Sequence, residues 1–214
     1  MSEFRIRTCT VGQMGTNCYI VYREDWKRGV IVDPGDNGKY ILNMCRELGV
    51  TPEAVVLTHG HFDHISAVEE IRRAFAGIDV YAAEKEAGLL EDPGLNLSAA
   101  FGTGISVRAT QLMRDGDILE LAGLRWKVME TPGHTAGSVC FLMEGEDVVI
   151  SGDTLFAESL GRTDFPTGSA AEIVKSITGR LFVLPEDTMV YPGHGEATTI
   201  GHEKKYNPVA FYKG

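Results

Sequence analysis

The sequence contains no long apolar run and no amino-terminal segment typical of a secreted protein. None of its apolar stretches approaches the roughly 20 residues that a bilayer-spanning helix needs. The first residues follow a strand, turn, strand pattern, without the basic segment and apolar core of a signal peptide. We therefore predict a soluble cytoplasmic protein that has neither a signal peptide nor a membrane as its partner.

Cysteines and basic residues are also few. The four cysteines, Cys9, Cys18, Cys45 and Cys140, include no Cys-x-x-Cys pair, so we expect free buried thiols in a reducing compartment. The 20 lysines and arginines are outnumbered by 30 aspartates and glutamates, which makes the formal net charge −10. Proteins that bind nucleic acid need a basic patch for its phosphates, so this charge balance argues against a nucleic-acid partner.

Low-complexity stretches and linkers are absent as well, and 214 residues suffice for one large core. The predicted strands cover residues 4–9, 18–22, 30–32, 54–57, 118–121, 124–130, 138–143, 147–150 and 189–191. The predicted helices cover residues 38–48, 65–76 and 170–181, with a short helix in the tail and a long loop over residues 91–116. Since each half has strands followed by a helix, we predict one domain over residues 1–214, with two packed sheets and helices outside.

Half of the six histidines fall in one run. Residues 58–64 read Thr-His-Gly-His-Phe-Asp-His and follow the strand predicted over residues 54–57. Imidazole nitrogens and carboxylate oxygens are good ligands for zinc and neighbouring transition metals. Because alternate residues of an extended chain point the same way, His59 and His61 could hold one ion together. Asp63 and His64, at the turn into the next helix, could reach a second ion.

Three further candidate ligands each follow a predicted strand. They are His134 in Thr-Pro-Gly-His-Thr, Asp153 in Ser-Gly-Asp-Thr and His194 in Tyr-Pro-Gly-His-Gly. The glycines allow the backbone to approach a crowded centre. Ligands taken from several strand ends also provide the rigidity that a catalytic metal site needs.

The full set, in this order and spacing, resembles the metallo-β-lactamase superfamily from Asp33 to His194. The resemblance implies an α+β fold, the αββα sandwich of two mixed β-sheets flanked by helices, with the site at one edge of the sheets. It also implies that the first ion is held by His59, His61 and His134, the second by Asp63, His64 and His194, and that Asp153 bridges both. Asp33 matches an early aspartate that supports the ligands from behind, although an aspartate before Pro-Gly is equally typical of a turn.

Two ions side by side can lower the pKa of a bridging water from about 15.7 toward 7 and can polarise a carbonyl oxygen. The bridging hydroxide would attack the carbonyl carbon, so no serine or cysteine nucleophile is required. Asp63 would orient the water or accept its proton. Zinc is the expected metal, with iron or manganese as alternatives, because sites of nitrogen and oxygen ligands accept all three.

Residues 152–168, which begin Gly-Asp-Thr-Leu-Phe, resemble the glyoxalase II group, whose members hydrolyse S-D-lactoylglutathione and related thioesters. Arg162 occupies the place of a lysine that contacts glutathione there, and its guanidinium could pair with a substrate carboxylate. The chain ends about twenty residues after His194, so a separate C-terminal glutathione-binding helical domain is not expected. Gly195 and Glu196 replace the tyrosine that follows the last ligand in that group, so the resemblance is to short bacterial hydroxyacylglutathione hydrolase-like proteins.

We therefore predict a metal-dependent hydrolase of a small-molecule thioester or ester. One alternative is a persulfide dioxygenase with a single iron, a branch that also carries Gly-Arg-Thr-Asp-Phe, and another is a lactonase. The commonest β-lactamases place a cysteine where Asp153 stands, which argues against antibiotic hydrolysis. The sequence makes no prediction about oligomeric state.

Overall fold

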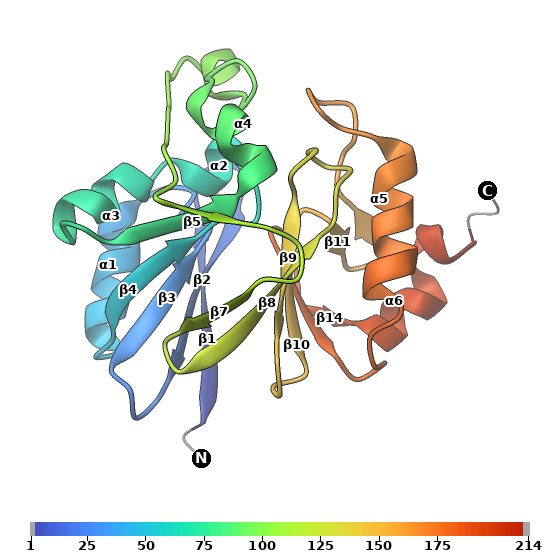
Figure 1. Ribbon diagram of the computed structural model, residues 1–214, viewed down its shortest axis with the longest axis horizontal. Coiled ribbons are helices and arrows are strands. Elements are labelled where there is room, and N and C mark those ends of the chain that lie inside the picture. The colour runs from blue at the N-terminus through green and yellow to red at the C-terminus, as the bar shows by residue number, and fades with distance from the viewer. Residues whose placement is uncertain (1–2, 212–214) are drawn as a thin grey trace.

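The computed structural model describes residues 3–211, which form two six-stranded sheets with helices on their outer faces (Figure 1). The first sheet has the order β1 (Phe4–Val11), β2 (Thr16–Arg23), β3 (Arg28–Val32), β4 (Thr51–Val56), β5 (Asp79–Ala83) and β6 (Gln111–Met113). Strands β1 to β3 pair antiparallel and β3 to β6 pair parallel, so this sheet is mixed.

The second sheet has the order β14 (Thr198–Thr199), β13 (Met189–Pro192), β10 (Val148–Gly152), β9 (Val139–Met143), β8 (Leu124–Glu130) and β7 (Ile118–Leu121). Its pairs are antiparallel except β10 with β13, so it is mixed as well. A hairpin of β11 (Leu155–Phe156) and β12 (Ser159–Leu160) follows β10 in the chain.

Helices cover both outer faces of the sandwich. Helices α1 (Gly38–Glu47) and α3 (Val68–Ala74) lie on the first sheet, and α5 (Ala170–Ser176) and α6 (Ile200–Tyr206) lie on the second (Figure 1). Two shorter helices, α2 (Phe62–Ile65) and α4 (Ala87–Glu91), lie near the edge where the strand ends meet (Figure 1). The predicted αββα sandwich of the α+β class is therefore confirmed.

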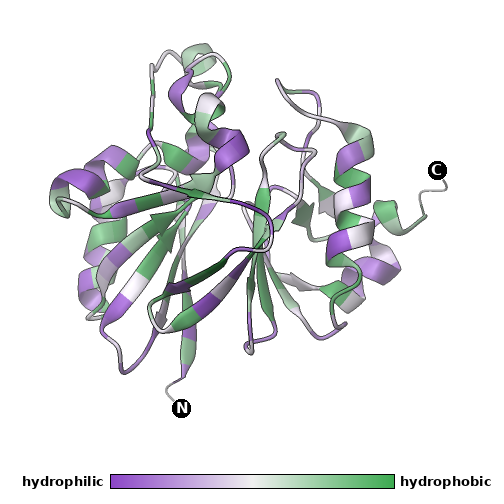
Figure 2. Cartoon of the chain, viewed as in Figure 1, coloured by the Kyte–Doolittle hydropathy of each residue, from purple (hydrophilic) through white to green (hydrophobic). Residues whose placement is uncertain are grey.

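Three apolar layers hold this arrangement together. Alternate residues of β2 belong to two different layers. Tyr19 and Val21 face the second sheet, while Cys18 and Ile20 pack beneath the helices. Trp126 and Phe141, both fully buried, meet edge to face with ring centroids 6.0 Å apart in the layer between the sheets. The central strands are therefore mostly apolar, whereas the outer helices alternate apolar and polar residues (Figure 2).

Some predicted elements differ from the structure. The helix predicted over residues 65–76 corresponds to α3, and a separate short helix, α2, begins before it inside the histidine run. Residues 91–116 are more than a loop, because they contain a 3₁₀ turn (Ser98–Phe101) and the edge strand β6. Strand β5 was not predicted, because its sequence Asp-Val-Tyr-Ala-Ala is short and includes two alanines, which have low strand propensity.

The longest helix that the structure describes, α1, has 10 residues, and none of the helices within residues 3–211 could cross a bilayer. The predicted domain limits, residues 1 and 214, lie outside the described residues.

Candidate metal centre

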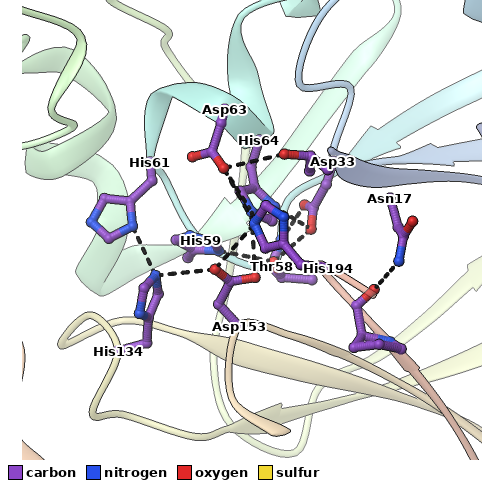
Figure 3. A network of polar contacts seen from close by, with 12 residues as sticks. Asn17, Asp33, Thr58, His59, His61, Asp63, His64, His134, Asp153 and His194 are labelled. Carbon is purple, nitrogen blue, oxygen red and sulfur yellow. Dashed lines mark hydrogen bonds and ion pairs between the residues drawn. The ribbon is translucent and has the colours of Figure 1, made fainter. Parts of the chain in front are cut away.

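All seven predicted ligand residues meet at one edge of the sandwich, where the loops that follow β4, β8, β10 and β13 converge (Figure 3). Three overlapping groups have ligand atoms within 4.8 Å of one another. They are His59, His61 and His134; His59, His64 and Asp153; and Asp63, His64 and His194. The groups share members, so the side chains form one continuous cluster.

Asp153 connects the groups. Its carboxylate lies 3.5 Å from His134 Nε2, 3.4 Å from His64 Nε2 and 3.5 Å from His194 Nε2. The neighbouring loop comes very close, because a Cβ atom on Gly193 would stand 2.1 Å from Asp153 Oδ1. Only glycine can occupy position 193 while the carboxylate keeps this place.

Hydrogen bonds behind the cluster set the orientation of its histidines. Thr58 donates its backbone N–H to Asp33 Oδ1 at 2.8 Å and its hydroxyl to Asp33 Oδ2 at 2.7 Å. Because that hydroxyl proton is already donated, Thr58 Oγ1 accepts from His59 Nδ1 at 3.1 Å. His64 Nδ1 likewise donates to Asp33 Oδ2 at 3.0 Å. Both imidazoles therefore carry a proton on Nδ1 and turn Nε2 toward the cluster.

Two more histidines also use Nδ1 to donate a hydrogen bond to an acceptor outside the cluster. His134 Nδ1 donates to the carbonyl of Arg162 at 2.7 Å, and His194 Nδ1 donates to the carbonyl of Met14 at 3.2 Å. His61 is the exception, since its Nδ1 lies 2.8 Å from His134 Nε2 inside the cluster. Four of the five histidines thus turn Nε2, and His61 turns Nδ1, toward the centre of the cluster.

The cluster fits divalent transition-metal ions. Three buried side-chain atoms within residues 3–211 have no hydrogen-bond partner, and all belong to predicted ligands: His59 Nε2, His61 Nε2 and Asp153 Oδ1. Buried polar atoms are almost always paired, so the unpaired His59 Nε2 and Asp153 Oδ1 inside the cluster indicate a ligand, while His61 presents its other nitrogen, Nδ1, to the cluster. The donors are imidazole and carboxylate, the set that zinc, iron and manganese accept.

The histidines of the cluster differ in the direction in which their surroundings shift the pKa. Burial, supported by neighbouring imidazoles, lowers the pKa of His61 to about 3, so this ring is neutral at pH 7. Burial opposes protonation of His64 and His194 too, but the Asp153 and Asp63 carboxylates outweigh it and raise their pKa to about 9 and about 10. In the metal-free protein these two rings carry protons that an incoming cation must displace, so metal affinity falls as the pH falls.

A cleft of about 340 Å³ opens over the cluster. Its walls include seven apolar side chains, those of Met14, Phe62, Leu97, Phe101, Phe156, Leu160 and Phe165. Phe101 stacks on Phe62 with ring centroids 4.4 Å apart, so the segment predicted as a loop contributes a wall of the cleft.

Arg162 lies on the rim of this cleft with an exposed side chain. Its guanidinium makes two hydrogen bonds to Asp164, of 2.8 and 3.0 Å, and lies 4.2 Å from the centroid of the Phe165 ring. The structure therefore places Arg162 beside the cluster, while its role in substrate binding stays a prediction.

Sequence reasoning missed several supporting residues. Thr58 belongs to the histidine run but received no role, although the second nitrogen of a metal-binding histidine almost always has a hydrogen-bond partner. Thr16 donates its hydroxyl to Asp63 Oδ2 at 3.1 Å, and Asn17 donates to the carbonyls of Pro192 and Gly195 at 3.1 and 2.9 Å. Thr16 and Asn17 come from the β1–β2 hairpin, far from the ligands in sequence, and no local signal identifies them.

The chain belongs to the metallo-beta-lactamase superfamily, because the family model matches residues 11–194. The probable metallo-hydrolase YqgX of Bacillus subtilis is 37% identical over 204 residues, which cover 94% of this chain and 95% of that protein. The hydroxyacylglutathione hydrolase GloC of Haemophilus influenzae is 32% identical over 195 residues, 90% of this chain and 91% of its own.

Solved structures agree with this membership. BLEG-1, a B3 metallo-beta-lactamase, superposes with a TM-score of 0.91 at 39% identity, covering 98% of this chain and 100% of its own. TTHA1623 in a di-iron-bound form has a TM-score of 0.84 at 34% identity, and the match covers 94% of this chain and 98% of that one. ETHE1 from Myxococcus xanthus has a TM-score of 0.82 at 32% identity, and the match covers 98% of this chain and 86% of that one. Fold, family and metal-binding cluster thus define a member of a metallo-hydrolase superfamily.

Proposed function

We propose that this protein is a binuclear metallohydrolase that cleaves thioesters of the hydroxyacylglutathione type. The observation that carries the proposal is the place of Asp153, whose carboxylate lies within 3.5 Å of histidines from both ends of the cluster (Figure 3). A carboxylate in this place suits a bridge between two ions. We assign the first ion to His59, His61 and His134, and the second to Asp63, His64 and His194.

When bound, two such divalent ions, zinc in this proposal, supply Lewis-acid chemistry by lowering the pKa of a coordinated water and polarising a carbonyl. Asp63 belongs to the cluster and also lines the cleft. Burial would raise the pKa of Asp63, but the charges of His64 and His194 outweigh this and hold it below its usual range. The Asp63 carboxylate therefore stays ionised, and we assign it the orientation of the attacking water and the acceptance of its proton.

The cleft supports a substrate with one anionic and one apolar part. Arg162 is the only lysine or arginine among the described residues that line it, and the other walls are largely apolar. A guanidinium is suited to binding a carboxylate with two parallel hydrogen bonds. This arrangement, together with the 32% identity to GloC, supports a thioester whose thiol half carries carboxylates.

Two other activities follow from particular likenesses. The 32% identity to ETHE1 and the sequence Gly-Arg-Thr-Asp-Phe favour a persulfide dioxygenase with one iron as the alternative. The likeness to BLEG-1 adds hydrolysis of a β-lactam to the activities that an assay must include, although no cysteine stands at position 153.

The test combines metal content with a substrate panel. Purified protein would be analysed for metal per chain and assayed on lactoylglutathione, other thioesters, lactones, a β-lactam and glutathione persulfide with an oxygen electrode. We expect two ions per chain and the highest kcat/KM on a glutathione thioester. One iron per chain with persulfide-dependent oxygen uptake would overturn the proposal, as would a clear preference for a lactone or a β-lactam.

Substituting Arg162 with alanine tests its substrate contact. We expect KM for lactoylglutathione to rise about tenfold with little change in kcat, because the charged hydrogen bonds bind ground state and transition state alike. Unfolding should occur at nearly the same temperature, since the exposed ion pair with Asp164 adds little stability. The matched variant Arg162→Lys should retain part of the affinity. An unchanged KM in Arg162→Ala would remove this residue from the substrate site.

A further inference from the structure

A buried carboxylate outside the predicted ligand set lies directly behind the cluster. Strand β5 is followed by a 3₁₀ turn (Glu84–Glu86), and Glu86, the last residue of this turn, is 1% exposed. Its Oε2 accepts a hydrogen bond from the backbone N–H of Gly60 at 2.9 Å. Its Oε1 accepts two more, from Thr135 Oγ1 at 2.7 Å and from the N–H of Gly137 at 2.9 Å.

These three donors belong to the two loops that supply the first group of ligands. Gly60 stands between His59 and His61, and Thr135 directly follows His134. The two loops follow β4 and β8, strands of different sheets. One carboxylate therefore joins the two halves of the sandwich at the point where His59, His61 and His134 meet.

The packing around this carboxylate is tight. A Cβ atom on Gly137 would stand 2.6 Å from Glu86 Oε1 and 2.8 Å from its Cγ, closer than real side chains approach. The position of Glu86 thus limits where the loop after His134 can lie. A displacement of this loop would change the separation of His134 from His59 and His61.

We propose that Glu86 is a positioning residue that sets the spacing of His59, His61 and His134 and thereby the affinity of the first metal site. A carboxylate suits this position because it accepts hydrogen bonds only, and three donors converge on it. Glutamine would present an NH₂ group to at least one donor, and alanine would leave all three unpaired. The inference rests on the assignment of the first ion under the proposed function.

The chain offers a matched control in Glu203. This carboxylate is fully buried and also accepts three hydrogen bonds, from Thr198 Oγ1 at 2.6 Å, Glu158 N at 2.9 Å and Asn207 Nδ2 at 2.8 Å. All three donors lie in or beside β12, β14 and α6, outside the loops that carry the ligands. Substitution of Glu203 therefore removes an equally buried carboxylate without touching the first site.

The experiment measures metal binding directly. Glu86→Gln, Glu86→Ala, Glu203→Gln and Glu203→Ala would be titrated with Zn²⁺ against a chromophoric chelator and with Co²⁺ by visible absorption, and their melting temperatures recorded. We expect Glu86→Ala to weaken binding of one of the two ions by about 10–100-fold, the usual effect of losing a residue that supports metal ligands. Glu86→Gln should weaken it less, and both Glu203 variants should keep wild-type affinity despite a lower melting temperature.

Wild-type affinity for both ions in folded Glu86→Ala or Glu86→Gln would overturn the inference. Equal losses of affinity in the Glu86 and Glu203 variants would also overturn it, because general destabilisation would then be the cause. Where the Glu86 variants do not fold, Thr135→Val removes one of the three hydrogen bonds, and unchanged affinity in that variant overturns the inference. A wild-type protein that binds no metal would refute the proposed function itself.

Discussion

Asp153→Ala is expected to lose the bridged pair of ions and to reduce thioester hydrolysis by about 10²–10³-fold or more, because the lost ions are the groups that would stabilise the negative charge of the transition state. The Asp153 carboxylate lies within 3.5 Å of three histidine nitrogens, and no other described side chain approaches the same three in the contacts of the cluster. Its removal leaves Asp63 as the one carboxylate beside the Nε2 atoms of His64 and His194, while Asp33 stays at Nδ1 of His64.

Two companion variants separate bridging from other effects. Asp153→Asn keeps the size of the side chain but replaces a charged carboxylate with a neutral amide that has one acceptor oxygen and is a weaker ligand for two cations, so its activity should fall nearly as far. Asp187→Ala removes a carboxylate from an exposed turn and should keep two ions per chain and full turnover. The measurements are metal per chain after dialysis and kcat/KM. Full turnover with two bound ions in Asp153→Ala would show that this residue does not bridge the metals.

Asp33→Asn is expected to have the second largest effect, through the protonation of His64. Asp33 is 2% exposed, and its Oδ2 accepts from both His64 Nδ1 and Thr58 Oγ1. An NH₂ group in the place of Oδ2 would require His64 Nδ1 to be unprotonated, which moves the proton to Nε2, the atom that faces the cluster. The opposite amide orientation would place NH₂ against the N–H of Thr58 and leave a buried donor unpaired, at a cost of about 1–3 kcal/mol.

Either orientation weakens the second metal site, and we expect metal affinity to fall by about 10–100-fold. An aspartate-to-asparagine change that imposes the wrong histidine tautomer lowers kcat by about 10⁴-fold in serine proteases, which shows how large such an effect can be. Chelator competition would measure the affinity, and ¹⁵N NMR of the imidazoles would report the tautomer of His64. The control is Asp36→Asn, three residues away and exposed. Unchanged affinity and an Nδ1–H tautomer in Asp33→Asn would show that Asp33 serves only the turn.

The ligand residues could be predicted because each of them follows a strand that the sequence pattern indicates. Segments such as residues 54–57 and 147–150 are short and largely apolar, and glycine and polar residues follow them directly. This pattern is typical of a buried strand that ends in a turn. The histidine spacing adds a second, independent signal, since so many imidazoles within a few residues have little use in an apolar core. The two signals together predicted the cluster that the structure brings together.

The supporting residues could not be predicted in the same way. Glu86 follows β5, a strand that sequence patterns did not indicate, and its three partners lie at positions 60, 135 and 137. Thr16 and Asn17 reach the cluster from the β1–β2 hairpin, and Phe101 reaches the cleft from a segment that looked like a loop. Each of these contacts joins residues far apart in sequence, so it exists only once the two sheets have packed.

The sequence alone therefore determined the chemistry of the site, because ligand type, order and spacing are local properties of the chain. The tertiary structure decided how that chemistry is arranged, since only the packing of two sheets places Asp153 between histidines from different loops. It also decided which nitrogen each histidine directs inward. That choice depends on acceptors such as Asp33 and the carbonyl of Arg162, which reach the imidazoles across the fold.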